Sequence, residues 1–412
     1  MATTAFGDTD YNALFKEHYF KLADNVYSTF SNLYSMVPKT FNFGGDLGKN
    51  PVGVTFGGSV GSGSLPTARS RKYLEPNYTR EKVYGVLDLD HETIQASEGA
   101  DAFIRATQEQ TLGVIKSFNR NMSRIFMNDG TGALGEFNGN AGGTATDPTI
   151  TIIDTSSDTY GFVPAYWEVG DYVNVNTLTS VWEVISVNET TKVVTLSRVS
   201  GSDDLTSIGA GDHQVYMQNS KDEDPTGALN MLSGTIHGVT AQKRWQASAN
   251  IDANAGGISP DFVNRMVEDI DTEADEPPNV LGFSPTQYRK YLNLLEDQKR
   301  YPQPVTLRPK GNERTPSRAI MKANIGFSGI QYVSSQGVVP IMKNKMIRPN
   351  SIWGFNMNQI EAAHAKAFGW FDLDGAVLHM KESTDSFFAR YGGFMEIKWN
   401  PMYVGRVHNL AT

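Results

Sequence analysis

The stretch SEGADAFIRATQEQTLGVIKSFNRNMSRIFMN, residues 97–128, has the clearest helical pattern in the chain. Ser97 is a suitable N-cap, and Glu98 behind it favours the positive end of the helix dipole. Asn128-Asp129-Gly130 is a typical helix end. One stripe at three- and four-residue steps contains Ala100, Phe103, Ile104, Thr107, Thr111, Val114, Ile115, Phe118, Met122, Ile125 and Phe126. The spacing predicts a helix of about eight turns with one buried face.

The segment before this helix, residues 42–92, is rich in Gly and Ser and ends in the alternating run KYLEPNYTREKVYGVLDLDHE. The pattern predicts a long two-stranded arm that runs out through 51–56 and back through 78–90. A lone hairpin of this size has no core and is marginally stable in water. We therefore expect the arm to need a partner surface.

The tip of the predicted arm, GGSVGSGSLPTARSR (57–71), contains two motifs that carry chemistry elsewhere. Ser59 satisfies G-x-S-x-G, but a nucleophile elbow needs a helix after the serine, and the following residues contain Gly and Pro without helical period. Gly58 and Gly63 have the spacing of a phosphate loop, but Ser64 stands where that loop needs lysine. We interpret the stretch as a bendable tip, with a serine hydrolase using Ser59 as an alternative.

An aromatic amphipathic helix is predicted at the N-terminus, over residues 11–37, with Pro38 closing it. Its stripe contains Tyr11, Leu14, Phe15, Tyr19, Leu22, Val26, Phe30, Leu33 and Val37. A helix with so many aromatic residues is expected to pack against a folded domain, either of its own chain or of a neighbouring chain.

After the long helix, short β-rich runs and turn clusters over 145–220 predict a small β-barrel or sandwich. From 228 to about 350 the pattern is mixed α and β, with helices predicted to begin at Ser259-Pro260 and Ser284-Pro285. The remainder alternates between strand-like runs and the loop FDLDGA at 371–376.

Opposite charges occur in two blocks of the mixed region. The acidic block contains Glu268, Asp269, Asp271, Glu273, Asp275 and Glu276. The basic block contains Lys299, Arg300, Arg308, Lys310, Arg314, Arg318 and Lys322, against the single acid Glu313. Such blocks are either solvated faces or surfaces through which copies of the chain meet, acid to base.

Composition excludes several functions. The 412 residues are 39% hydrophobic, which is globular composition. The net charge of −9 argues against a dedicated nucleic-acid binder. There is no cysteine, no long apolar run for a membrane span and no signal-peptide pattern at the N-terminus.

No motif for catalysis or metal binding stands out. The seven histidines are scattered, without zinc-ligand spacing. Asp372 and Asp374 are expected in a turn rather than a calcium loop. Asp88 and Asp90 share one face of a predicted strand. We interpret them as a salt-bridge face and not as a catalytic carboxylate pair. We expect no catalytic residue, no cofactor and no metal.

The order of these parts, with ALNMLSGTIHGVTAQKRWQAS (228–248) and IMKNKMIRPNSIWGFNMNQIEAA (341–363), resembles the major capsid protein of tailed double-stranded DNA bacteriophages. That fold is shared with encapsulins. The resemblance implies an α+β capsid fold. Its parts would be an N-arm at 1–41, an extended loop at 42–92, a peripheral domain at 93–144 with the spine helix 97–128, an inserted β-domain at 145–220, an axial domain at 228–340 and a return to the peripheral domain at 341–412.

The resemblance further implies a structural protein that self-assembles through hexamers and pentamers into an icosahedral virion shell around packaged double-stranded DNA. Assembly would take place in the host cytoplasm, with no membrane and only weak, non-specific contact with DNA. Separate scaffolding, portal and decoration proteins are candidate partners, and an encapsulin-like or other self-assembling protein is the alternative.

Inter-subunit contacts are expected at three places. The extended loop would contribute Gly57, Gly58, Gly61, Gly63, Arg69, Arg71, Lys72, Arg80 and Lys82, and the N-arm Tyr11, Phe15, Tyr19 and Phe30. The charged candidates are Glu268, Asp269, Asp271, Arg308, Lys310, Arg314 and Arg318.

Overall fold

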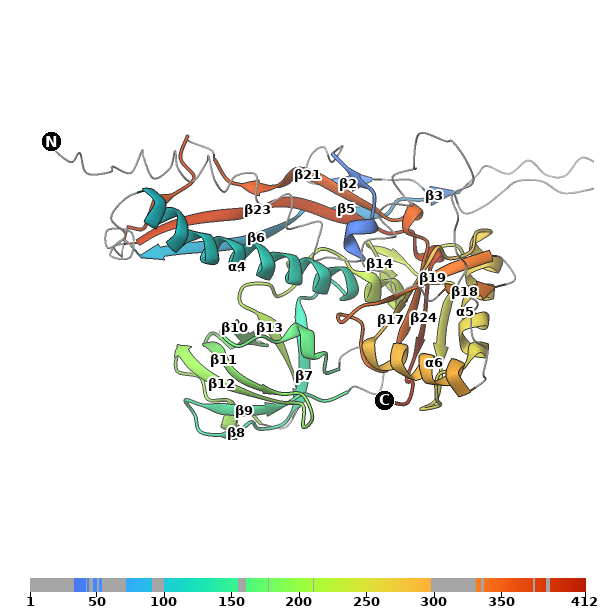
Figure 1. The fold of residues 1–412 in the computed structure, drawn as a ribbon, viewed down its shortest axis with the longest axis horizontal. Helices are drawn as coiled ribbons and strands as arrows, with labels where there is room; N and C mark the ends of the chain where they lie inside the picture. The colour runs from blue at the N-terminus through green and yellow to red at the C-terminus, as the bar shows by residue number, and fades with distance from the viewer. Residues whose placement is uncertain are drawn as a thin grey trace, which may run out of the picture.

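The computed structural model describes residues 33–41, 43, 47–49, 52–53, 72–90, 100–154, 161–176, 178–209, 211–297, 331–334, 337–372, 375–382 and 386–412. This part of the chain contains three α-helices and many strands, which confirms the predicted α+β class. A long helix lies under an extended sheet, and a small all-β unit and an α/β unit lie on the helix side of that sheet (Figure 1).

The extended sheet is built around one long strand, β23. Its strands are β1 (Lys39–Thr40), β6 (Glu81–Asp90), β21 (Glu361–Trp370), β22 (His379–Met380) and β23 (Ser386–Lys398). β6 pairs antiparallel with one edge of β23, while β21 and β22 pair with the other edge. β1 adds to β21 in parallel. The sheet thus joins a segment before the long helix to the C-terminal part of the chain.

Helix α4 (Ala100–Met127) covers one face of this sheet (Figure 1). It lies within the predicted range 97–128. The buried stripe includes Phe118, Met122 and Phe126, and the ring of Phe118 meets that of Tyr391 on β23 edge-on at 5.0 Å. The apolar spacing of the sequence therefore produced the helix and selected the face that packs on the sheet.

The N-terminal prediction is wrong at its end. Within the described residues, Tyr34–Met36 form the 3-10 turn η1 instead of continuing an α-helix. Tyr34 is buried and packs edge-on against Phe126, and the chain then enters β1. Residues 11–32, with the predicted contact residues Tyr11, Phe15, Tyr19 and Phe30, lie outside the described residues.

Two short antiparallel pairs lie between β1 and β6. Their strands are β2 (Leu47–Lys49), β3 (Val52–Gly53), β4 (Tyr73–Leu74) and β5 (Asn77–Thr79). β2 pairs with β5, and β3 pairs with β4 farther along the same two segments. The outgoing and returning segments therefore form a hairpin arm as far as residues 53 and 73, and the tip at 57–71 lies outside the described residues.

The all-β unit contains β7 (Ala133–Asn138), β8 (Gly142–Gly143), β9 (Pro148–Thr151), β10 (Tyr172–Val175), β11 (Val181–Asn188), β12 (Val193–Ser200) and β13 (Asp212–Met217), with the 3-10 turns η2 (Pro164–Tyr166) and η3 (Leu205–Ser207). Their order is β7-β13-β10-β11-β12-β9-β8. A bridge from Glu136 on β7 to Ile153 after β9 closes the sheet into a barrel.

The barrel begins earlier than the predicted boundary at residue 145. β7 pairs antiparallel with β13 from Asn138 opposite Asp212 onward, so it belongs to this sheet. The barrel core is apolar and contains Val173, Val175, Trp182, Val184, Val194, Leu196 and Val215, all fully buried.

The α/β unit has the strand order β16-β24-β20-β17-β19-β18. Its strands are β16 (Ala249–Asp252), β17 (Val280–Phe283), β18 (Gln331–Ser334), β19 (Gly337–Lys343), β20 (Ile352–Phe355) and β24 (Val404–His408). Its helices are α5 (Pro260–Ala274) and α6 (Pro285–Asp297). β20 and β24 come from the segment 341–412 that was assigned to the peripheral return. Their hydrogen bonds to β17 and β16 place them here instead.

Both helices of this unit begin as predicted. The Ser259 hydroxyl accepts from the backbone N–H of Phe262, and the Ser284 hydroxyl accepts from that of Gln287. The link from the barrel contains η4 (Ala228–Leu232) and the hairpin of β14 (Thr235–Ile236) and β15 (Val239–Thr240). Two further 3-10 turns, η5 (Met357–Gln359) and η6 (Pro401–Tyr403), follow β20 and precede β24.

Candidate functional site

One face of the extended sheet is covered by α4, and the other carries large exposed side chains. On β6, Val83, Leu87 and Leu89 are buried, whereas Tyr84 is 44% and Val86 59% exposed. The alternation follows from the two-residue period of a strand. We call the second face the open sheet face. It consists of Arg80, Lys82, Tyr84, Val86, Lys366, Phe371, Arg390 and Phe394.

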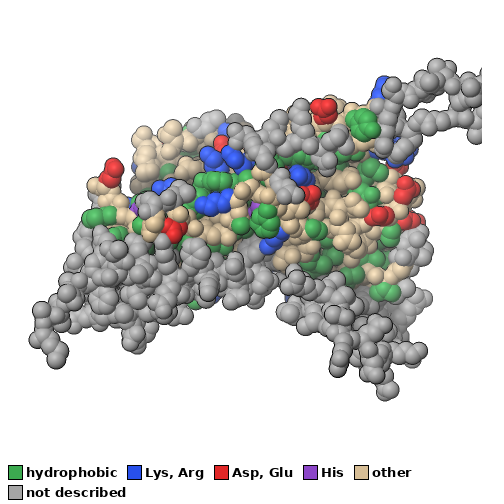
Figure 2. Space-filling model, turned by 90° about the horizontal axis from the view of Figure 1, so that it is seen from above, with side chains coloured by type: hydrophobic (Ala, Val, Ile, Leu, Met, Phe, Trp, Pro, Cys, Tyr) green, Lys and Arg blue, Asp and Glu red, His purple; other side chains and the backbone are tan. Residues whose placement is uncertain are grey.

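Aromatic rings and cations alternate on the open sheet face. The rings of Tyr84, Phe371 and Phe394 form a cluster with centroid separations of 5.6, 5.9 and 6.3 Å. The Lys366 ammonium lies 3.4 Å from the Phe371 centroid, and the Arg80 guanidinium lies 5.5 Å from that of Phe394. Figure 2, which views the molecule from above the sheet, shows hydrophobic and basic side chains interspersed on this side.

The register of the strands brings these residues together. Lys82 lies opposite Phe394, and Val86 lies opposite Arg390. Two of the predicted loop contacts, Arg80 and Lys82, therefore lie on the open sheet face. Lys72 is exposed on the arm just before β4, apart from them. Gly57, Gly58, Gly61, Gly63, Arg69 and Arg71 lie outside the described residues, as does Ser59.

Sequence reasoning missed Lys366, Phe371, Arg390 and Phe394. The alternation in SFFARYGGFMEIK was a usable signal, because it places Phe388, Arg390 and Phe394 on one strand face. Phe371 was assigned only to a loop. Its place beside Tyr84 depends on the pairing of distant strands.

The base of the arm is anchored through Tyr78. This side chain is buried with Phe43 and Ala363, and its ring centroid lies 4.4 Å from that of His237 in the β14–β15 hairpin. Burial lowers the pKa of His237 to about 4, so the imidazole is neutral here at physiological pH. Farther out, Tyr73 on β4 is exposed. The arm is therefore fixed at its base, and its described outer part has little core of its own.

A buried polar centre joins α4, the segment before η4 and β23. Arg124 on α4 and Asp224 form an ion pair at 2.8 Å, with side chains only 3% and 8% exposed. Glu396 on β23 accepts from the backbone N–H of Thr226 at 2.9 Å, and the Trp399 indole donates to the Thr226 carbonyl at 2.7 Å. The stretch 220–227, which connects the barrel to η4, is thus tied to the helix and the sheet.

Burial raises the pKa of Glu396 to about 8, and the charge of Glu81 adds to this effect. The side chain is 2% exposed, and it accepts from the backbone N–H groups of Thr226 and Ile397 and from the Thr226 side chain. Glu396 is therefore largely protonated at neutral pH, which avoids an unpaired buried charge.

The exposed side of α5 is acidic. Glu268 is exposed and Asp269 and Asp271 are partly exposed, while Val263, Met266, Val267 and Ile270 point into the core. Arg265 is close to Asp269, with a nitrogen–oxygen distance of 3.9 Å. The predicted basic counterparts Arg308, Lys310, Arg314 and Arg318 lie outside the described residues.

Among the described residues no group of three or more His, Asp or Glu side chains could hold a metal ion. No helix in the same part of the chain combines the length and apolar character needed to cross a bilayer. The described Asp88 forms an ion pair with Lys381, in keeping with the predicted salt-bridge face on β6.

Solved structures similar to this chain are phage capsid proteins and encapsulins, the class that the sequence resembles. A chain of the Cyanophage A-1(L) capsid has 9% sequence identity and a TM-score of 0.48, with 100% of this chain and 95% of that chain covered. The capsid of the native GTA particle has 8% identity and a TM-score of 0.45, covering 92% and 90%. The SrpI encapsulin from Synechococcus elongatus PCC 7942 has 7% identity and a TM-score of 0.44, covering 92% and 86%. No protein-family model matches the sequence, and neither does any curated protein.

Proposed function

We propose that this chain is a major capsid protein that self-assembles through hexameric and pentameric capsomers into an icosahedral shell around packaged double-stranded DNA. The observation that carries the proposal is the open sheet face, where Tyr84 and Val86 are 44% and 59% exposed beside the rings of Phe371 and Phe394. Contiguous apolar surface of this kind marks an interaction site in a water-soluble protein.

The arm supports the same proposal. Its described strands pair with one another in units of two or three residues, and such a hairpin gains stability by packing on another surface. In a shell, that surface belongs to an adjacent copy. We assign the glycines at 57, 58, 61 and 63 to a tip that bends over the neighbour, and the N-terminal aromatic residues to a second contact.

The acidic side of α5 is the third proposed contact. Glu268, Asp269 and Asp271 would face the basic segment that contains Arg308, Lys310, Arg314 and Arg318 in a neighbouring copy. Complementary charges of this kind select the correct register and suppress wrong pairings.

Individual contacts can be weak in such an assembly. Each subunit meets several others, so an interface of about micromolar affinity is sufficient when many act together. The net charge of −9 limits attraction between the shell wall and packaged DNA. Separate scaffolding, portal and decoration proteins would complete the particle, which would assemble in the host cytoplasm.

The proposal is tested by sedimentation velocity and negative-stain microscopy of the full chain, expressed alone and with its candidate scaffold. Closed shells of megadalton mass that protect DNA from nuclease support the capsid assignment. Closed shells that enclose protein cargo and no DNA favour the encapsulin alternative. A monomer or dimer that persists at high concentration contradicts both.

A further inference from the structure

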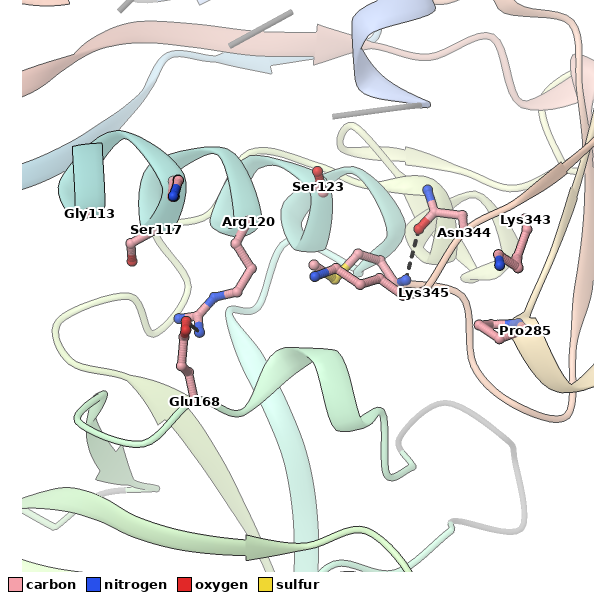
Figure 3. Close-up of a pocket in the computed structure, with 11 residues that line it drawn as sticks. Gly113, Ser117, Arg120, Ser123, Glu168, Pro285, Lys343, Asn344 and Lys345 are labelled. Atoms are coloured by element: carbon pink, nitrogen blue, oxygen red, sulfur yellow. Dashed lines mark hydrogen bonds and ion pairs between the residues drawn. The ribbon is translucent and has the colours of Figure 1, made fainter. Parts of the chain in front are cut away.

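A cleft of about 670 Å³ lies where α4, the barrel and the loop after β19 meet. Gly113, Lys116, Ser117, Arg120 and Ser123 line it from α4, Glu168 lines it from the barrel, and Pro285 and residues 343–346 line it from the α/β unit. Figure 3 shows these three sides around one space, with Lys345 extending beneath the helix. The volume is in the range of small-molecule sites, roughly 300–1,000 Å³.

The lining is strongly cationic in a protein whose net charge is negative. Among the described lining residues, Lys116, Arg120, Lys343 and Lys345 are cationic and Glu168 alone is a carboxylate. Arg120 is occupied, since it forms ion pairs with both Glu168 and Asp171.

The two lysines of the loop after β19, Lys343 and Lys345, differ from Arg120 in their ion pairing. Within the described part of the chain, Lys343 and Lys345 have no carboxylate at ion-pair distance, and both are exposed. The cleft therefore has an excess of positive charge that an incoming anion would neutralise.

The loop that presents these lysines is held in place. The backbone N–H of Asn344 donates to the Phe283 carbonyl at 2.9 Å, and the Asn344 side chain accepts from the N–H of Met346 at 2.8 Å. The Tyr166 hydroxyl of the barrel donates to the Met346 carbonyl at 3.3 Å. A fixed loop of this kind loses little conformational entropy when it binds a ligand.

The lining chemistry indicates which anion fits. Lysine ammonium groups act as point charges for phosphate oxygens, and the Ser117 hydroxyl is an additional donor. None of the described lining residues is aromatic, so they offer no platform on which a base could stack. Recognition would therefore be of phosphate groups and not of a nucleobase.

We propose that this cleft binds phosphate groups, supplied by a free polyphosphate or by the backbone of a nucleic-acid strand, and that the bound anion bridges α4 and the α/β unit. The inference does not depend on shell assembly. An anion held by Lys343 and Lys345 of the loop and by the Ser117 hydroxyl of α4 strengthens the contact between the helix and the α/β unit.

Isothermal titration calorimetry of the full chain tests the site, with tripolyphosphate in one arm and single-stranded oligothymidylate in the other. We expect tripolyphosphate to bind at least tenfold more weakly to the double variant Lys343→Gln/Lys345→Gln than to the wild type. The control is Lys221→Gln/Lys243→Gln, which removes two exposed lysines that do not line the cleft. This control should bind as the wild type does.

The second arm separates the two sources of phosphate. Oligothymidylate that competes with tripolyphosphate supports a nucleic-acid backbone as ligand, and oligothymidylate that fails to compete supports a free polyphosphate. Three results overturn the proposal: no heat with either probe, equal weakening in the cleft and control variants, or equal displacement by polyglutamate, which would show an acidic peptide site instead.

Discussion

The ammonium of Lys366 lies 3.4 Å from the centre of the Phe371 ring on the open sheet face, where Lys366 is opposite Phe394. Lys366 lies within β21 and Phe371 directly follows that strand, and both join Tyr84 of β6 and Phe394 of β23. Three segments far apart in the sequence therefore meet to form one aromatic and cationic surface. Cation–π contacts order the long basic side chains and leave the ring edges available to a partner.

Val86→Glu should abolish assembly while leaving the fold intact. The side chain is 59% exposed at the centre of the open sheet face, so a carboxylate there costs little in the free subunit but would be desolvated in an interface. Val199→Glu is the matched control, since Val199 is 52% exposed on β12 of the barrel. Sedimentation velocity should show shells for the control only, with unchanged circular dichroism for both.

Arg124→Met should destabilise the subunit by about 3–5 kcal/mol, because it leaves Asp224 buried without its partner. The double variant Arg124→Met/Asp224→Leu should lose less than the sum of the single variants. Urea unfolding of the four proteins gives the coupling energy. Lys192→Met is the control, since it breaks the exposed pair with Asp154 and should cost less than about 1 kcal/mol. Additive single effects would contradict the buried pair.

Glu396→Gln should change the pH dependence of stability. The pKa of Glu396 is raised to about 8, so the folded state holds a proton that the unfolded state loses from about pH 4.5 upward. The protonated Glu396 side chain therefore contributes fully to the free energy of unfolding below about pH 4.5. This contribution is lost progressively as the pH rises to 8. The variant lacks this loss and should exceed the wild type by about 2–4 kcal/mol at pH 8.5, with the difference shrinking toward pH 5. Parallel stability curves across this range would refute the assignment.

Gly392→Ala should destabilise the extended sheet, whereas Gly369→Ala should not. The two glycines lie opposite each other on β23 and β21. A Cβ at Gly392 would overlap the backbone carbonyl of Val83 on β6, while a Cβ at Gly369 would meet nothing within 4 Å. We expect a loss of about 2 kcal/mol or more for the first variant and less than about 1 kcal/mol for the second. Thermal unfolding measured under identical conditions compares them, and equal melting temperatures would contradict this register.

Local patterns in the sequence predicted α4, α5 and α6 well. The apolar spacing over 97–128 gave α4 and its buried face, and the Ser-Pro pairs at 259 and 284 gave the starts of α5 and α6. These features depend on interactions within a few residues, which a single sequence contains.

Features that depend on distant pairing were harder to predict. β7 was left outside the barrel because only its pairing with β13 assigns it there. The contact of Arg124 with Asp224 joins a helix position to a residue a hundred positions away, in the segment after the barrel, and no local pattern in the sequence predicts it. Phe371 looked like part of a turn until β21 and β23 placed it beside Tyr84. Strand register and tertiary packing, which local propensity does not encode, determine all three.

The most direct test of the account is a cryo-electron microscopy reconstruction of whatever particle the purified full chain forms. We predict a closed icosahedral shell in which the open sheet face, with Tyr84, Val86 and Phe394, is buried against an adjacent subunit. A particle in which this face remains in solvent, or a chain that stays monomeric with any scaffold supplied, would contradict the central claim.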